Sequence, residues 1–467
     1  MTAAPAPMHA LVPEEVLAVC RRLRGKGYEA HLVGGGVRDM LLGRKPADFD
    51  VATDARPEEV RDLFGATFAI PTGIKHGTVT VLTTSAAYRH VEVTTFRGEG
   101  VYLDGRRPSS VTYVKLLRDD LARRDFTMNA VAYDPIDDRL SDPFDGQGDL
   151  ARRLIRAVGD PLERFGEDGL RPMRAVRQAA QLGFSIEPAT HAAIPRSLEV
   201  VRKVSAERIR DELLKLLASP QPSRGLELMR ETGLLAEVIP ELLEGVGCTQ
   251  NRFHKHDVYG HTLAVVDATE GDAVVRLGAL LHDVGKPRAR QPREGAPGEY
   301  SFFKHEYVGR DMADAICRRL KLPNADRERV VGMVAHHMFY YASDWSDGAV
   351  RRFVRNVGGG EALDALFALR KGDVAGRGFG EDPEGEIGEL QSRIATVAAS
   401  DAALHVTDLR INGGDVMRLL GLPPGREVGQ VLERLLERVI DDASLNERER
   451  LEALLPEVLA ELPKKPG

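Results

Sequence analysis

The sequence predicts an α/β domain with a small mixed sheet, followed by an all-α remainder. Short apolar or alternating runs bounded by glycine are confined to the first 150 residues, whereas apolar residues recur at helical spacing from about Asp149 onward. The 467 residues are too many for one core, so several domains are expected. Composition breaks at Pro240 and over 376–388 predict the domains 1–150, 151–240, 241–385 and 386–467.

Each expected element follows from a local pattern. A proline followed by two acidic residues indicates the start of a helix, and glycines indicate its end. Alternating β-branched residues indicate strands. In chain order we expect a helix over 14–23, a strand over 31–33, a helix that begins near Val37, a strand that carries Asp48 and Asp50, a helix capped by Thr53 and Asp54 that runs through Phe64, and strands over 78–83 and 88–95. Helices are expected over 169–182, 205–218, 224–231 and 277–281, and an amphipathic one through Val439.

Bulk properties exclude several classes of protein. The three cysteines lie far apart without a Cys-x-x-Cys pair, which argues against a disulfide framework or zinc ribbon. No apolar stretch is long enough to span a bilayer, so a cytoplasmic protein with no membrane partner is expected. The net charge of −7 gives no support to nucleic-acid binding. Arginines nevertheless recur over 151–215, which fits either a polyanionic partner or a solvated helix surface.

The most informative pattern joins a glycine turn to two carboxylates. Gly34 and Gly35 follow a buried strand and let backbone amides approach a phosphate, with Arg38 in the helix that follows. Asp48 and Asp50 point to one face of the next strand because side chains alternate. Either half alone is typical of an ordinary turn or strand end. Together they predict a magnesium-dependent nucleotidyl-transfer site.

Downstream segments add candidate ligands for a nucleotide. Glu92 lies on a strand from which a third carboxylate could reach the metal, although an exposed strand acid fits equally well. Arg124 and its neighbour Arg123 could hold a triphosphate. Arginines at 171, 174 and 177 share one helix face, as in a salt-bridged helix. With Asp168, Arg171 would also make a base reader that accepts C and A, because both present an amine donor beside a ring acceptor.

These segments resemble the bacterial class II tRNA nucleotidyltransferase and poly(A) polymerase family, whose members build the 3′ CCA end of tRNA. The resemblance rests on Leu-Val-Gly-Gly-Gly-Val-Arg-Asp with Asp-x-Asp, on Arg-Arg-Asp-Phe-Thr-Met-Asn-Ala and on Glu-Asp-x-x-Arg-x-x-Arg. It implies a nucleotidyltransferase head, a helical neck, and tRNA, CTP and ATP as partners. It also implies site roles: Asp48 and Asp50 as metal ligands, Gly35, Arg38, Arg124, Arg174 and Arg177 as nucleotide contacts, and Asp168 with Arg171 as the base-reading pair.

Two stretches bear on the branch within this family. The segment Gly73-Ile-Lys-His-Gly-Thr78 resembles the CCA branch rather than the poly(A) polymerases. The loop over 98–108 is present, whereas CC-only enzymes are marked by its shortening. Addition of CCA and addition of A alone both stay open.

Histidine and aspartate gather in a second constellation. Imidazole and carboxylate together predict a metal site. The series resembles the HD phosphohydrolase superfamily, including Lys286 after the His-Asp pair. This resemblance implies a binuclear site that binds a divalent transition metal, and a hydrolase activity on 2′,3′-cyclic or 2′-phosphates. A degenerate HD fold that only packs against tRNA is the alternative, and an HD hydrolase with an inactive RNA-binding head is another. The candidate ligands are His261, His282, Asp283, His305, His336, His337 and Asp373. Residues after 388 resemble the tRNA-binding tail of HD-containing relatives, or are simple helix caps.

Overall fold

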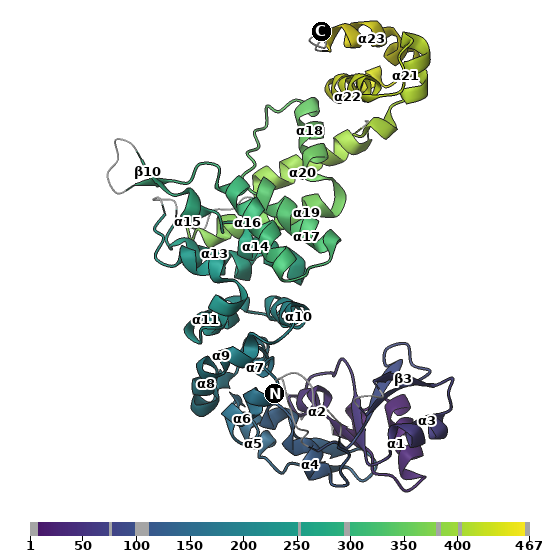
Figure 1. The fold of residues 1–467 in the computed structure, drawn as a ribbon, viewed down its shortest axis with the longest axis vertical. Helices are drawn as coiled ribbons and strands as arrows, with labels where there is room; N and C mark the ends of the chain where they lie inside the picture. The colour runs from purple at the N-terminus through teal and green to yellow at the C-terminus, as the bar shows by residue number, and fades with distance from the viewer. Residues whose placement is uncertain are drawn as a thin grey trace. The chain divides into compact units, whose positions relative to one another are not determined.

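In the computed structural model, the described residues are 8–73, 77–98, 112–250, 254–293, 299–379, 384–399 and 404–462. The chain divides into two compact units, Met1–Leu243 and Glu244–Gly467. Figure 1 colours the first unit purple to teal and the second teal to yellow. Most of the loop over 98–108 and the histidine of the Gly73–Thr78 segment lie outside the described residues.

The first unit contains a seven-stranded sheet with the order β3-β4-β5-β2-β1-β6-β7. Only β2 and β5 pair in parallel and the other pairs are antiparallel, so the predicted mixed sheet is confirmed. In the register, Asp50 lies opposite both Val33 and Glu92. The strands are β1 (His31–Val33), β2 (Asp50–Thr53), β3 (Ala69–Gly73), β4 (Thr78–Leu82), β5 (His90–Thr95), β6 (Ala132–Asp134) and β7 (Arg139–Ser141).

Two apolar clusters cover opposite faces of this sheet. Val51 belongs to the larger cluster, which packs under α1 (Glu14–Arg24) and α3 (Pro57–Phe64). Ala52, the next residue, belongs to a smaller cluster with Leu121 of α4 (Leu117–Ala122). Because strand side chains alternate, Asp50 shares the face of Ala52. The carboxylate therefore lies on the face with the thinner apolar cover.

Three local expectations differ from the structure. The strand expected to carry both aspartates begins at Asp50, so Asp48 precedes it. The predicted cap at Thr53 and Asp54 is wrong, because α3 starts after Arg56 and the Asp54 carboxylate accepts from the Glu29 amide instead. Strands β3, β6 and β7 were not expected. Three consecutive residues of β3 are exposed, which breaks the alternation, and β6 and β7 span three residues each without the glycine turn that marked β1.

The neck that follows is helical, apart from a parallel pair of two-residue strands, β8 (Leu154–Ile155) and β9 (Ser185–Ile186). The three helices expected here over 169–182, 205–218 and 224–231 are present with ends shifted by one or two residues. The helices are α5 (Gly146–Ala151), α6 (Pro161–Glu167), α7 (Arg171–Leu182), α8 (Pro188–Ala193), α9 (Leu198–Val201), α10 (Ala206–Leu217), α11 (Pro222–Glu231) and α12 (Leu234–Val238).

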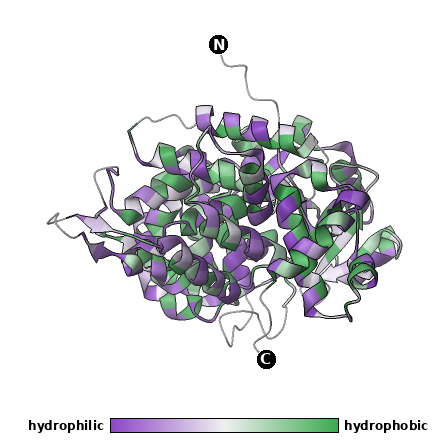
Figure 2. Cartoon of the chain, turned by 90° about the horizontal axis from the view of Figure 1, so that it is seen from above, coloured by the Kyte–Doolittle hydropathy of each residue, from purple (hydrophilic) through white to green (hydrophobic). Residues whose placement is uncertain are grey.

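The second unit is also helical apart from the hairpin of β10 (Gln291–Pro292) and β11 (Tyr300–Ser301). Figure 2 shows hydrophobic and hydrophilic residues mixed along the helices of the chain, as expected where helices pack around a core on one side and face water on the other. No described helix is long and apolar enough to cross a bilayer. The helices are α13 (Val258–Ala268), α14 (Ala273–Leu281), α15 (Lys286–Ala289), α16 (His305–Arg319), α17 (Asn324–His336), α18 (Asp347–Val357), α19 (Gly360–Gly376), α20 (Glu384–Ala399), α21 (Gly413–Leu420), α22 (Arg426–Asp441) and α23 (Arg448–Glu461).

Candidate functional site

Three carboxylates meet where β2 and β5 run side by side. Asp50 begins β2, Glu92 lies opposite it on β5, and Asp48 precedes the strand by two residues. Burial together with the charges of Asp48 and Glu92 raises the pKa of Asp50 to about 6, against the opposing pull of Arg124. The predicted acids therefore share one local field of uncompensated negative charge. Such an all-oxygen set fits a hard divalent cation.

Gly34 forms the turn between β1 and α2 (Gly35–Leu41). Its φ of 76° lies in the region that favours glycine. A Cβ built there would lie 3.2 Å from an Arg124 guanidinium nitrogen and 3.4 Å from an Asp50 carboxylate oxygen. The turn therefore lies close to one predicted phosphate-binding arginine and to one predicted metal ligand.

Arg38 extends from α2 toward the neck. Its Nη1 donates to the Asn129 Oδ1 at 3.2 Å and to the Gln178 Oε1 at 3.4 Å, and its Nε donates to Asp39. Gly35 lies against the same guanidinium, since a Cβ there would be 3.6 Å from Nη2. Two of the predicted nucleotide contacts, Gly35 and Arg38, are therefore neighbours in space.

The predicted base-reading pair has separate partners. Arg171 donates to the Glu167 carboxylate and to the carbonyls of Arg164 and Arg123. Asp168 accepts from Arg208 at 2.7 Å, and its other oxygen accepts from a backbone amide. In the described structure both side chains are thus occupied by protein groups rather than directed at each other.

The other two arginines of α7 also carry ion pairs. Arg174 donates to Asp125 at 2.6 Å, and Arg177 donates to Glu212 of α10 at 2.5 Å. Although burial alone would raise the pKa of Asp125, Arg174 and Asn129 hold it below its usual range. These pairs fix α7 against the head and against the rest of the neck, as expected of a salt-bridged helix.

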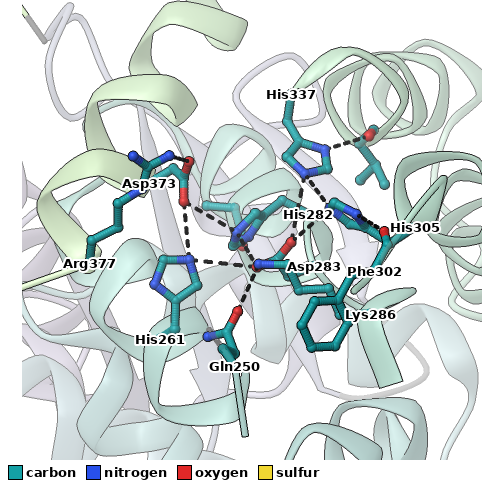
Figure 3. Close-up of polar contacts among 12 residues, drawn as sticks. Gln250, His261, His282, Asp283, Lys286, Phe302, His305, His337, Asp373 and Arg377 are labelled. Atoms are coloured by element: carbon teal, nitrogen blue, oxygen red, sulfur yellow. Dashed lines mark hydrogen bonds and ion pairs between the residues drawn. The ribbon is translucent and has the colours of Figure 1, made fainter. Parts of the chain in front are cut away.

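The second constellation assembles in the interior of the second unit (Figure 3). His261 comes from α13, His282 and Asp283 follow α14, and His305 starts α16. Their donor atoms form two groups that share Asp283, and within each group all donor atoms lie within 4.8 Å of one another. The groups are His261, His282 and Asp283, and Asp283, His305 and His337.

Backbone carbonyls orient three of the imidazoles. The Nδ1 atoms of His282, His305 and His337 lie 2.7, 2.8 and 2.8 Å from the carbonyls of Ala279, Phe302 and Val334. A carbonyl only accepts, so each Nδ1 carries a proton and each ring turns its Nε2 toward Asp283. The Nε2 atoms of His305 and His337 face each other at 3.1 Å. Two lone pairs at that distance need a cation or a shared proton between them, which fits a metal centre.

The other members complete a compensated cluster. His261 Nε2 lies 3.1 Å from Asp373 and 3.6 Å from Asp283, and Lys286 Nζ lies 2.6 Å from Asp283. Despite burial, His282 and Lys286 hold the pKa of Asp283 well below its usual range. Arg377 lies against the outer oxygen of Asp373 at 3.3 Å. Each carboxylate is therefore ionised beside at least one cationic group.

The structure places one predicted metal ligand, His336, apart from the others, and it brings one further histidine, His254, next to the cluster. His336 is half-buried and belongs to neither group of possible ligands among the described residues, because consecutive side chains on a helix point about 100° apart. The structure does not support its predicted role as a ligand. His254 was not predicted, yet its ring lies 4.8 Å from that of His261. Its position in the histidine-rich stretch was the available signal.

A cavity of about 400 Å³ opens onto the cluster. Asp283, Lys286 and Asp373 line its floor, and the exposed side chains of Phe303 and Met338 line it as well. The cluster can therefore be reached by a small ligand.

Gly285 fixes the spacing between two of the ligand-bearing segments. A Cβ at this residue would lie 2.4 Å from the His305 carbonyl and 2.5 Å from the Gly309 amide. The chain just after Asp283 is thus in direct backbone contact with the first turn of α16, which carries His305.

Family models match four stretches of the chain. Residues 30–156 match the Poly A polymerase head domain, and residues 183–245 match the Probable RNA and SrmB-binding site of polymerase A. Residues 251–364 match the HD domain, and residues 385–455 match tRNA nucleotidyltransferase domain 2.

Similarity to individual proteins extends over nearly the whole sequence. The CCA-adding enzyme of Geobacillus kaustophilus is 36% identical over 447 residues, which cover 95% of this chain and 96% of that protein. The chain belongs to the family of CCA-adding enzymes. The predicted resemblance is thus confirmed. A relative from Lactobacillus johnsonii is 50% identical over 222 residues, so that match spans 48% of this chain and about half, 54%, of the relative.

Solved structures of CCA-adding enzymes share the fold. The crystal structure of the Bacillus stearothermophilus CCA-adding enzyme in complex with CTP has a TM-score of 0.71 at 31% identity and covers 95% of this chain and 96% of that one. The Thermotoga maritima CCA-adding enzyme complexed with tRNA has a TM-score of 0.55 at 19% identity, covers 98% of each chain, and shows a likeness in fold alone.

Proposed function

We propose that this chain adds C, C and A to the 3′ end of tRNA, using CTP and ATP and releasing pyrophosphate. The observation that carries the proposal is the group of three carboxylates at β2 and β5, in a chain that matches a CCA-adding enzyme over 96% of that protein's length. The tRNA 3′ hydroxyl attacks the α-phosphate, the bond from that phosphorus to the β-phosphate bridging oxygen breaks, and the hydroxyl proton leaves. We propose a cytoplasmic location, since tRNA, CTP and ATP are present there.

Asp48 and Asp50 would hold Mg²⁺, with Glu92 beside them. The bound ion supplies charge neutralisation for the attacking and leaving oxygens. Burial and the charges of the other two acids raise the pKa of Asp50. A cation bound among the three carboxylates would favour the ionised form of Asp50. Arg38, Arg124 and the glycine turn line the same region and would bind the triphosphate through guanidinium and backbone donors.

We propose that residues of the neck select the base of the incoming nucleotide. Asp168 can accept from the exocyclic amine of C or A, and Arg171 can donate to the adjacent ring acceptor. Both groups already have protein partners, Arg208 for Asp168 and Glu167 for Arg171. Base reading therefore requires that a nucleotide replace or share these contacts.

Sequencing of products tests the proposal. The protein is incubated with tRNA that lacks CCA, together with CTP and ATP, and the new 3′ ends are read. CCA ends support the proposal. Addition of A alone, with no CTP incorporated, would identify an A-adding enzyme, and long A tails would identify a poly(A) polymerase.

The second unit favours a further activity, hydrolysis of a phosphate ester such as a 2′,3′-cyclic or 2′-phosphate. The observation behind it is the approach of three imidazole Nε2 atoms, from His282, His305 and His337, to the Asp283 carboxylate beside an accessible cavity. His261, His282, His305, His337, Asp283 and Asp373 would hold divalent transition metal ions. Bound ions supply an activated water. Release of phosphate, or ring opening of a cyclic phosphate, with added Mn²⁺, Co²⁺ or Ni²⁺ tests it, and no turnover with any of them would indicate a packing role.

A further inference from the structure

Gln178 is a buried amide on α7 that the site described above does not use. It is 1% exposed. Its Oε1 lies 3.4 Å from Arg38 Nη1 and 3.3 Å from Asn129 Nδ2, and it accepts from both. Its Nε2 has no hydrogen-bond partner among the described residues.

Chemistry fixes the orientation of this amide. Both neighbouring groups are donors, so the oxygen must face them, and a flipped amide would set its own N–H groups against two others. The price of this orientation is a buried N–H left without an acceptor, which is unfavourable for folding. The oxygen, in contrast, is fully used, because it accepts from Arg38 and from Asn129. The contacts of this oxygen therefore point to its task.

The task follows from what the oxygen contacts. Arg38 Nη1 also donates to Asn129 Oδ1, and Asn129 Nδ2 donates to Asp125 at 2.9 Å. Asp125 in turn accepts from Arg174 of α7. Gln178 and Arg174, one turn apart on α7, thus close a hydrogen-bonded loop that runs through the head to Arg38.

We propose that Gln178 is a positioning residue, through which neck helix α7 sets the orientation of the Arg38 guanidinium for the nucleotide phosphates. This inference rests on the proposed role of Arg38 in nucleotide binding. Phosphates are common to CTP and ATP, so the effect of Gln178 falls on both nucleotides alike and leaves the choice of base unchanged.

Gln178→Met tests the proposal, since it keeps the length of the side chain and removes both amide atoms. Arg38 and Asn129 retain their bond to each other, so the variant should still fold, and its melting temperature checks this. We expect the KM values for CTP and ATP to rise by the same factor, about five- to tenfold, as for loss of one ordinary hydrogen bond. The kcat and the discrimination against UTP and GTP should stay as in the unchanged enzyme. Gln178→Leu serves as a second variant, and Gln147→Met, an exposed residue of α5, serves as the control.

A double-mutant cycle with Arg38→Met separates the outcomes. If Gln178 acts through Arg38, the Gln178→Met change has no further effect on KM in the Arg38→Met protein. Multiplying effects would overturn the positioning role, and so would changed discrimination between bases. If Arg38→Met leaves both KM values unchanged, the nucleotide-binding role of Arg38 fails. If Arg38→Met raises KM and neither Gln178 variant does, only the inference about Gln178 fails.

Discussion

The two candidate metal sites of this chain differ in how their charges are balanced. In the head, three carboxylates share a field that raises the pKa of Asp50 to about 6. In the second unit, Asp283 has His282, His305 and Lys286 around it, and its pKa is held low. Among the described residues, Arg124 is the cation whose charge opposes the rise in the pKa of Asp50, whereas in the second site Lys286 pairs with Asp283 and Arg377 with Asp373 before any ion binds.

This difference has a consequence for metal use. An uncompensated oxygen site gains most from an ion that arrives with its substrate, as Mg²⁺ does with a nucleoside triphosphate. A buried site of oriented imidazoles is prepared for a resident transition metal ion. The two sites should therefore be separable by mutation and by the metal supplied.

The largest effect is expected from the carboxylates of the head. Replacing Asp48 and Asp50 together by alanine should lower CTP and ATP incorporation by about a thousandfold or more, because the metal loses its ligands. Hydrolysis of phosphate esters by the second unit should stay unchanged. Incorporation of labelled nucleotide into tRNA measures nucleotide addition, and release of phosphate measures hydrolysis.

Asp62→Ala, at an exposed position of α3, is the matched control and should have no effect. Full nucleotide addition by the double variant would refute the assignment of Asp48 and Asp50 as the metal ligands. If the unchanged protein added no nucleotide but hydrolysed phosphate esters, the head would be an RNA-binding module and the chain chiefly a hydrolase.

A substitution in the second unit tests the other candidate metal site. His305→Gln removes an Nε2 ligand from the group that contains Asp283 and His337. We expect hydrolysis to fall by about a hundredfold and bound transition metal, measured by mass spectrometry, to decrease. Nucleotide addition should be unaffected.

His336→Gln is the control for this change, because His336 is adjacent to a proposed ligand but outside both groups. Equal losses in the two variants would contradict the assignment of His337 over His336.

A smaller effect is expected on the choice of nucleotide. Asp168→Ala removes the acceptor for the exocyclic amine, so discrimination against UTP and GTP should fall by about tenfold, the value of one base contact. Competition assays with pairs of nucleotides measure it. Asp211→Ala on α10 provides an exposed control, and unchanged discrimination would refute the template role.

The smallest effect concerns stability of the head. Asp125→Asn breaks a largely buried ion pair with Arg174 and should lower the free energy of unfolding by about 2 kcal/mol at neutral pH. Since the folded-state pKa of Asp125 is lowered, its stabilisation is present above the ordinary carboxyl pKa and is lost as pH falls through the folded value. Denaturant unfolding should show the difference between the two proteins shrinking below about pH 4. A constant difference down to pH 2 would contradict this linkage.

The sequence located most of the site-bearing elements because their signals are local. The glycine turn, the helix with Arg38 and the alternation at Asp50 each lie within a few residues. The short strands β6 and β7 could not be predicted, since pairing with distant segments defines them. The partners of Arg171 and Asp168 were also beyond reach, because Arg123 and Arg208 come from other parts of the chain. His336 and His337 are indistinguishable by spacing, and only the helix orientation separates them.

The close contact at Gly285 has a consequence for how the second unit can lose its proposed activity. A single methyl group there would push the first turn of α16, and His305 with it, away from Asp283. The ligands themselves would be intact, and the sequence would still display each of them. A prediction based only on the presence of the metal ligands would therefore count such a variant as functional. The substitution of Gly285, which is not a ligand, would nevertheless have abolished the activity.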